Sequence, residues 1–381
     1  MNVVGKGLTL ADARPVTHMS GPDELLPLTS LRFFAAAAIV YLHIQGPTFG
    51  LPQITNFALG QGVSFFFILS GFILTYRYPD LRGRDAVWDF LVRRFARIWP
   101  AHVIGLIVAL VLVWRGTFGV YDVDAGIYHL VAAVLLIQTW TPISAWQDSV
   151  NGPAWSISVE FLFYLLFPLL IRDFTRTWHW KLAASLGVAL SLCLYGNLHD
   201  LSWGKPGEQG VDSSSLIYYF APARAFEFVL GMCAALLWNC TLRDIKLRSA
   251  IWTMIEVLAV SAVLYASHVS AKTTGSTFNN WLSISGIISG PAAFLIVVMA
   301  SSRGVLARLL GFRPLAILGE ISYSIYLLHY SIAHYLTSNK HAGTQDWVAL
   351  IFLLACILGA AFLSWKYAEK PLRRKIIAAG S

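Results

Sequence analysis

Charged residues are scarce in this chain of 381 residues, because Asp, Glu, Lys and Arg together make up only 13% of it. Soluble domains contain about 25% charged residues, and 57% of this chain is hydrophobic, so the composition excludes an ordinary soluble domain. The formal net charge of +8 does not indicate nucleic-acid binding, because the basic residues lie between long apolar stretches, as in membrane proteins. The sequence therefore predicts an all-α integral membrane protein. Its expected surroundings are membrane lipid, and we expect no nucleic-acid partner.

Cysteine is also rare, and several signature motifs are missing. The four cysteines lie in or beside apolar segments without CxxC or metal-type spacing: Cys193, Cys233, Cys240 and Cys356. The sequence contains no GxSxG, HExxH or P-loop motif. His341 and Asp346 form an H-x4-D pattern, which we interpret as chance because it falls in a predicted loop. We expect no metal site.

Long apolar stretches are abundant, and ten of them can cross about 30 Å of hydrocarbon. They are residues 27–46, 57–77, 98–115, 155–172, 180–197, 217–238, 250–268, 282–300, 316–336 and 347–367. If the shorter stretch 127–141 does not cross, every basic cluster falls on one side, which the positive-inside rule identifies as cytoplasmic. We therefore predict a bundle of about ten transmembrane helices, both termini in the cytoplasm, and a re-entrant or interfacial segment near 127–141.

The predicted organisation is a single membrane domain with short polar ends. Residues 1–26 are mostly polar, and we expect them to form a flexible cytoplasmic tail. Residues 27–370 are the predicted transmembrane domain, and residues 371–381 are expected to form a basic cytoplasmic tail.

The first apolar stretch carries two ionisable residues, Arg32 and His43. At 100° per residue they lie on nearly the same face of a helix, about 16 Å apart along its axis. Ionisable side chains inside a membrane are costly and usually face a protein interior or a wet cavity. This pair therefore indicates a functional path along the first helix.

Three other predicted helices bring ionisable residues to a similar depth: Glu160, Arg224 with Glu227, and His329. We expect these groups to surround one polar cavity with His43. A histidine can remove a hydroxyl proton, and a carboxylate on its other nitrogen would fix its tautomer. Glu160 is the first candidate for that carboxylate and Glu227 the second; the alternative is a structural ion pair between Glu160 and Arg224.

The third stretch begins with an arginine cluster, Arg93, Arg94 and Arg97. Guanidinium groups match phosphate oxygens, so this cluster can bind a phosphate-bearing ligand from the cytoplasm. The alternative is that it sets the topology through attraction to anionic lipid. Ser70 and Gly71 in the second stretch either admit a ligand or allow close helix packing.

Seven segments in order along the chain resemble the acyltransferase-3 family of integral membrane O-acyltransferases. They are LTSLRFFAAAAIVYLH near 29–43, GVSFFFILSGFILTY at 62–76, RRFARIWP at 93–100, WSISVEFLFYLLFPLL at 155–170, RAFEFVLG at 224–231, LGEISYSIYLLH at 318–329 and EKPLRR at 369–374. That family includes bacterial enzymes that acetylate O-antigen, exopolysaccharide and Nod factor, and relatives that act on macrolides.

The resemblance implies an acyl-CoA donor, usually acetyl-CoA, that enters from the cytoplasm, and an acceptor hydroxyl reached from the other side. It implies His43 as base or acyl carrier, Arg32 on the donor path, and Arg94 with Arg97 at the CoA end. The sequence departs from the family at two places: Thr29 stands near a position often held by Asp, and Phe161 replaces a second acidic residue.

On these grounds we predict an O-acetyltransferase of a bacterial inner membrane that modifies a carbohydrate such as exopolysaccharide, O-antigen or a lipid-linked oligosaccharide. The predicted roles are catalytic for His43, Glu160 and Arg32; donor-binding for Arg93, Arg94, Arg97, Ser70 and Gly71; and substrate-binding for Arg224, Glu227, Tyr326, His329 and Trp155. Direct transfer and a relay through acylated His43 stay open, as do the acceptor and the oligomeric state. The competing interpretation is a multi-span transporter or exporter of a glycan or small solute.

Overall fold

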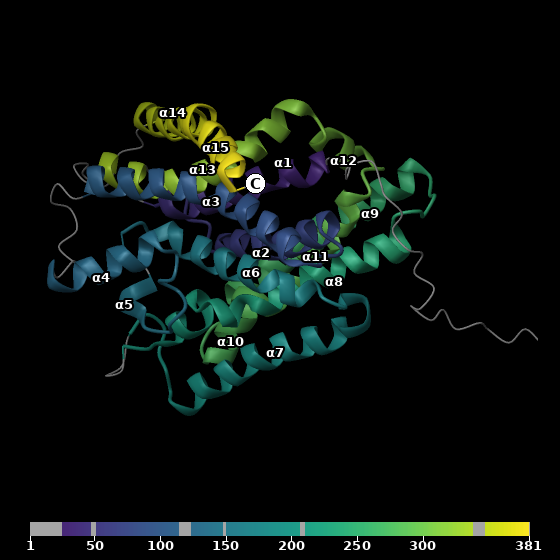
Figure 1. Cartoon of the computed structure of the whole chain (residues 1–381), viewed down its shortest axis with the longest axis horizontal. Coiled ribbons are helices and arrows are strands. Elements are labelled where there is room, and N and C mark those ends of the chain that lie inside the picture. Colours follow the sequence, from purple (N-terminus) through teal and green to yellow (C-terminus); the bar gives the residue numbers. More distant parts are fainter. Residues whose placement is uncertain are drawn as a thin grey trace, which may run out of the picture.

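A computed structural model describes residues 25–46, 51–113, 123–147, 150–205, 210–337 and 347–380. Residues 1–24 of the expected N-terminal tail and the His341–Asp346 pattern lie outside these ranges. The chain forms a bundle of helices (Figure 1). Within the described ranges the only β-structure is an isolated bridge between Gly46 and Leu51.

Ten helical stretches of the described chain are long and apolar enough to cross a membrane, which confirms the predicted multi-pass bundle. Their main helices are α1 (Leu26–Ile44), α2 (Gly62–Arg77), α3 (Arg84–Val113), α6 (Trp155–Ile171), α7 (Phe174–Leu198), α8 (Ala225–Leu237), α9 (Ser249–Lys272), α11 (Ile287–Ala300), α13 (Arg313–Thr337) and α14 (Trp347–Leu363) with its continuation α15 (Lys370–Gly380). Four shorter helices lie between them: α4 (Val123–Val134), α5 (Ser144–Gln147), α10 (Thr277–Trp281) and α12 (Val305–Leu310). On which side of the membrane the termini lie stays a prediction.

The stretch near 127–141 is not among the ten described helices that are long and apolar enough to cross a membrane. Its helix, α4, has 12 residues and is therefore about 18 Å long, well short of the hydrocarbon core. The chain turns directly after it, with Leu136 in the left-handed region at φ 58°. This short helix matches the predicted re-entrant or interfacial segment.

Two pairs of helices approach so closely that only glycine fits at the contact. A Cβ atom on Gly71 of α2 would lie 2.0 Å from the Phe228 carbonyl oxygen of α8, and one on Gly231 of α8 would lie 1.9 Å from a carbonyl oxygen of α2. Likewise, a Cβ atom on Gly319 of α13 would lie 1.9 Å from the Thr29 carbonyl oxygen of α1. Small residues commonly allow helices in membranes to pack this tightly. These contacts fix α1 against α13 and α2 against α8.

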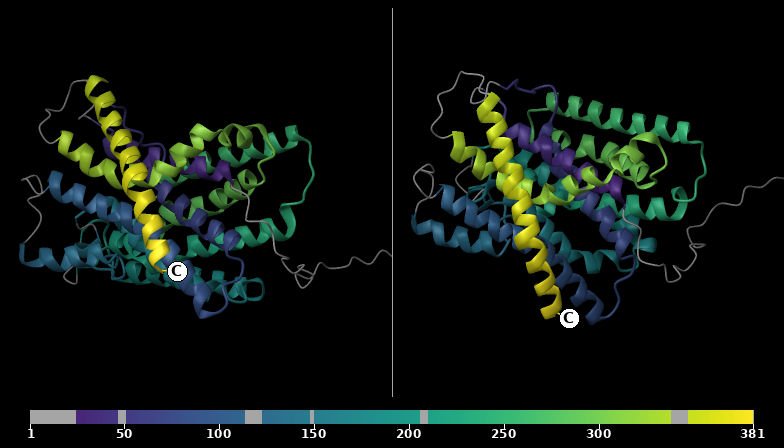
Figure 2. Two further views of the ribbon diagram at one scale, coloured as in Figure 1. Left: turned by 45° about the horizontal axis from the view of Figure 1, so that its top comes forward. Right: turned by 90° about the horizontal axis from the view of Figure 1, so that it is seen from above.

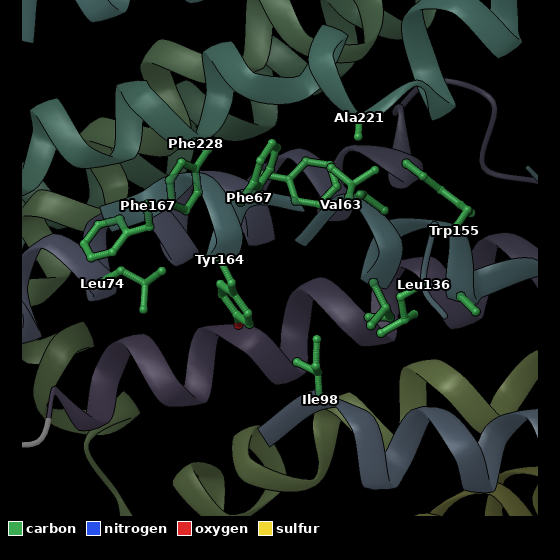
Figure 3. Close-up of a cluster of buried hydrophobic side chains, with 14 of the residues drawn as sticks. Val63, Phe67, Leu74, Ile98, Leu136, Trp155, Tyr164, Phe167, Ala221 and Phe228 are labelled. Carbon is green, nitrogen blue, oxygen red and sulfur yellow. The ribbon is translucent and has the colours of Figure 1, made fainter. Parts of the chain in front are cut away.

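Aromatic side chains fill the core between α2, α6 and α8 (Figure 3). The Phe163 and Phe228 rings stack with centroids 4.8 Å apart, and Phe67 meets Phe163 edge-on at 5.4 Å. Both are favoured aromatic geometries. Tyr164 belongs to the same cluster but points away from the Phe67 and Phe228 rings (Figure 3), so its hydroxyl is available to a polar site.

The last helix, α15, packs against the long helix α3 near the C-terminus (Figure 2). Helix α3 has 30 residues, and the stretch from α14 to α15 has 34. The Trp88 indole N–H of α3 donates to the Gly380 carbonyl oxygen at 3.2 Å, so the C-terminus lies beside the first turns of α3. Residues 371–380, which we expected to be a basic tail, are therefore helical and packed on the bundle.

Candidate functional site

Two histidines from distant parts of the chain meet at one end of the bundle. His43 lies in the last turn of α1, and His329 lies in α13. The His43 Nδ1 atom is 2.9 Å from the His329 Nε2 atom. His43 is exposed, whereas His329 is fully buried. We call this end of the bundle the histidine end; there, an accessible imidazole is supported by a buried one.

The hydrogen bonds of His329 fix the tautomers of both rings in their neutral forms. The His329 Nδ1 atom lies 2.7 Å from the Tyr326 carbonyl oxygen, which can only accept, so Nδ1 carries the proton. The His329 Nε2 atom then accepts the Nδ1–H of His43. The remaining nitrogen of His43, Nε2, keeps a lone pair, which is the state that a general base needs.

A cavity of about 390 Å³ lies between α1, α2, α3, α6, α13 and the C-terminal stretch. Six cationic and three acidic side chains line it: Arg32, Arg77, Arg94, Arg97, Lys370 and Arg373, with Glu160, Glu320 and Glu369. Residues from the start of α1, Leu25 and Leu26, also line it. We call this end of the bundle, which carries Arg77, Arg97 and Arg373, the arginine end. The cavity therefore begins at the opposite end of α1 from His43.

A side-chain wall lies between the cavity and the two histidines. Ser156 and Tyr326 line the cavity, whereas His43 and His329 do not. The Ser156 hydroxyl donates to the Tyr326 hydroxyl at 2.9 Å, and the Tyr326 carbonyl accepts from His329 on the other side. Tyr326 therefore contributes to both sites: its side chain lines the cavity, and its backbone carbonyl orients His329.

Most of the five arginines that line the cavity lack a hydrogen bond or ion pair among the described residues. Arg32, Arg97 and Arg373 form no hydrogen bond or ion pair in the part of the chain that the structure describes. Arg94 is buried; one of its terminal nitrogens donates to the Tyr78 hydroxyl at 3.2 Å, and its Nε has no partner in the described chain. An unpaired nitrogen on the buried Arg94 is costly, and the other guanidinium groups face the same cavity, so this arrangement is suited to an anionic ligand.

Glu160 faces this cavity and not the histidines. Its Oε1 atom accepts the Tyr164 hydroxyl, one helical turn away, and the Ser70 hydroxyl at 3.2 Å. The expectation that Glu160 is the hydrogen-bond partner of the His43 ring is therefore wrong, because His329 takes that place. Tyr164 and Ser70 hold the Glu160 carboxylate in the same cavity as Arg32 and Arg97.

Two of the residues predicted to bind the donor lie elsewhere. The Arg93 Nε atom pairs with Asp89 at 2.7 Å, on a surface where both side chains are more than two-fifths exposed, and Arg93 does not line the cavity. Gly71 is buried in the contact between α2 and α8, which favours the packing role that the sequence left open. Arg94, Arg97 and Ser70 do line the cavity, as predicted donor-binding residues should.

Arg224 and Glu227 form a separate, fully buried ion pair. The Arg224 Nε atom lies 2.7 Å from Glu227 Oε2, and an Arg224 terminal nitrogen lies 2.8 Å from Oε1. The guanidinium group also donates to the Ser64 hydroxyl and lies 5.1 to 5.8 Å from the ring centroids of Phe67, Tyr218 and Trp155. Neither charged residue lines the cavity.

The buried ion pair and the rings around it include three residues that were predicted to bind substrate: Arg224, Glu227 and Trp155. The polar atoms of the Arg224–Glu227 pair are satisfied within the bundle, and Trp155 packs against it, so the structure favours a helix-stabilising role for all three. Arg224 pairs with Glu227, and the alternative ion pair between Glu160 and Arg224 is absent among the described residues.

The cavity residues that were not among the predicted site residues include Tyr164, Tyr323, Glu369 and Arg373. Tyr164 follows Glu160 by one helical turn, a spacing that places both on one face. Glu369 accepts the Ser324 hydroxyl and, at 2.8 Å, the Ser364 hydroxyl. Glu369 and Arg373 belong to the terminal EKPLRR segment. That segment resembles the family, but the resemblance assigned no function to either residue.

Comparison with known proteins decides the family. Residues 28–366 match the acyltransferase-3 profile, described as an acyltransferase domain. The chain belongs to the acyltransferase-3 family. The match runs from the first turn of α1 into the segment that precedes α15, so it covers the histidine pair and most of the cavity, but not Glu369 and Arg373.

Three curated relatives are similar over almost the whole chain. Acyltransferase MdmB of Streptomyces mycarofaciens is 31% identical over 92% of both chains. The putative peptidoglycan O-acetyltransferase YrhL of Bacillus subtilis is 28% identical over 93% of this chain and 56% of its own. The O-acetyltransferase OatA of Staphylococcus aureus is 25% identical over 96% and 60%. This acyltransferase thus spans little more than half of the last two relatives, and no solved structure matches it.

Proposed function

We propose that this membrane acyltransferase moves an acetyl group from acetyl-CoA to a hydroxyl group of a carbohydrate-bearing acceptor, at the inner membrane of a bacterium. The observation that carries the proposal is the pairing of an arginine-lined cavity at one end of α1 with an accessible imidazole base at the other. The relatives named O-acetyltransferases support the reaction type.

The cavity supports a polyanionic donor. Six cations and three carboxylates line it, and Arg32 and Arg97 form no hydrogen bond or ion pair in the described chain. CoA carries several phosphate charges, and guanidinium groups bind phosphate in a bidentate manner. In this proposal the nucleotide end of the donor binds at the arginine end, and its thioester extends along α1 toward Tyr326.

The histidine pair supports acceptor activation. In direct transfer, His43 Nε2 removes the proton of the acceptor hydroxyl, whose oxygen attacks the thioester carbonyl carbon. The carbon–sulfur bond breaks, and the proton on His43 passes to the CoA thiolate. In the relay alternative, His43 Nε2 itself attacks the thioester carbonyl carbon, and the carbon–sulfur bond breaks to release the CoA thiolate. The acceptor oxygen then attacks the acetyl group on Nε2, the bond to Nε2 breaks, and the hydroxyl proton ends on the CoA thiolate. In both routes His329 accepts from His43 Nδ1 and stabilises the charge on its ring.

The acceptor approaches at the histidine end. His43 is exposed there, and Tyr330 lies edge-on to it at 5.4 Å, an aromatic neighbour suited to a sugar ring. The name of YrhL, a putative peptidoglycan O-acetyltransferase, agrees with a carbohydrate acceptor.

Two measurements test the proposal. Purified protein in lipid nanodiscs should consume acetyl-CoA in the presence of extracted envelope glycans, and His43→Ala protein should not. In cells, proton NMR of extracted glycans should show an O-acetyl signal with wild-type protein that disappears with His43→Ala at matched expression. Wild-type protein that neither binds nor consumes acetyl-CoA would rule out the donor and favour the transport interpretation.

A further inference from the structure

The last helix returns to the mouth of the cavity. One continuous helical stretch of 34 residues is formed by α14, the π-helical segment Ser364–Glu369 and α15. It is about 50 Å long, and thus longer than the hydrocarbon core of about 30 Å. Its final part lies beside the first turns of α3, which also exceeds the membrane thickness (Figure 2). Arg94 and Arg97 of α3 and Arg373 of α15 all line the cavity.

Contacts at both ends hold α15 in place. Before the helix, Glu369 is bound by Ser324 of α13 and by Ser364, and the Lys370 ammonium lies 3.4 Å from the centroid of the Trp365 ring. At its end, the Gly380 carbonyl accepts the Trp88 indole N–H, and a Cβ atom on Gly380 would lie 2.6 Å from the Val92 side chain. The backbone that carries Arg373 is therefore anchored on each side.

Arg373 lies among other cations. It lines the cavity together with Arg77, Arg94 and Arg97, and these three arginines interact with it electrostatically. Arg373 has no hydrogen bond or ion pair with any described residue. Arg373 is exposed at the cavity mouth, and like charges repel one another, so a bound anion would offset the repulsion among these four arginines.

From this arrangement we infer that Arg373 binds a phosphate group of the CoA donor and that α15 serves to hold it at the cavity mouth. The inference rests on the proposed donor. Arg374, the next residue, provides a matched comparison, because it carries the same charge on the same helix but does not line the cavity. A phosphate contact requires Arg373 in particular, whereas a general attraction to anions would depend on both residues.

Binding of CoA and of pantetheine, which lacks the phosphates, to full-length protein in nanodiscs separates these cases. We expect Arg373→Ala to raise the Kd for CoA at least tenfold and to leave pantetheine binding unchanged. Arg374→Ala should stay within twofold of wild type, and Arg373→Lys should lie between the two because it keeps the charge but loses the guanidinium fork.

The outcomes distinguish failure of this inference from failure of the proposed function. Equal weakening by Arg373→Ala and Arg374→Ala, or no weakening by either, overturns the role of Arg373 while the CoA donor stands. Wild-type protein that binds no CoA overturns the donor proposal and this inference together. Unchanged thermal melting of Arg373→Ala protein would show that lost binding does not come from unfolding.

Discussion

The Nδ1 atom of His43 lies 2.9 Å from the Nε2 atom of His329, although the two residues are 286 positions apart in the sequence. The Tyr326 carbonyl holds the His329 proton on Nδ1, so the pair leaves a lone pair on His43 Nε2. Serine-protease triads use a carboxylate to fix the tautomer of the base; here a backbone carbonyl and a second imidazole do so without a negative charge.

The first prediction concerns this pair. We expect His43→Ala to abolish transfer, and His329→Phe to lower kcat by about 10²- to 10⁴-fold, the range for loss of acid–base assistance. The KM for acetyl-CoA should not change, because neither ring lines the cavity. His179→Ala serves as a control, since His179 is exposed on α7 and should behave as wild type. A His329→Phe enzyme with normal kcat would show that His43 acts without its partner.

The second prediction separates donor binding from membrane topology. Arg97→Ala should raise the KM for acetyl-CoA at least tenfold and leave the KM for the acceptor unchanged, because a charge-assisted contact to phosphate contributes about 1.5–3 kcal/mol. Arg93→Ala is the matched control, since Arg93 pairs with Asp89 outside the cavity. Steady-state kinetics of both variants test this. Equal effects of the two substitutions would favour the lipid-topology interpretation of the cluster.

The third prediction concerns the wall between the cavity and the histidine end. Tyr326→Ala removes a side chain that faces the cavity and bonds to Ser156, but keeps the carbonyl that orients His329. We expect this variant to hydrolyse acetyl-CoA in the absence of acceptor, because water can then reach the thioester. Release of free CoA measures that leak. His43→Ala combined with Tyr326→Ala should not leak if His43 activates the water.

The fourth prediction assigns the Arg224–Glu227 pair to stability. Removal of one partner leaves an uncompensated buried charge, so Arg224→Ala or Glu227→Ala should destabilise the fold by about 3–5 kcal/mol and lower the yield of folded protein. Replacement of both by apolar residues, Arg224→Met with Glu227→Leu, should recover much of the loss. Thermal melting in detergent compares the variants. The double variant should keep the wild-type KM for acetyl-CoA, whereas a large rise would place the pair in substrate binding after all.

Local properties of the sequence determined the architecture. Hydropathy over about 20 residues reports helix length against membrane thickness, so the ten spans and the short α4 were predictable without any contact. Helical periodicity likewise placed Arg32 and His43 on one face of α1. Both properties depend only on residues near one another in the sequence, and both agree with the structure.

The tertiary structure alone decided which polar groups meet. The sequence favoured Glu160 as the partner of His43 and left open its pairing with Arg224, yet His43 bonds to His329 and Arg224 to Glu227. The depth of a side chain in the membrane depends only on its position along its own helix. Which side chains of two helices come into contact depends on how the helices pack, here around Gly71, Gly231 and Gly319. The return of Arg373 to the cavity mouth depends on the same packing, because only the docking of α15 on α3 brings the end of the chain there.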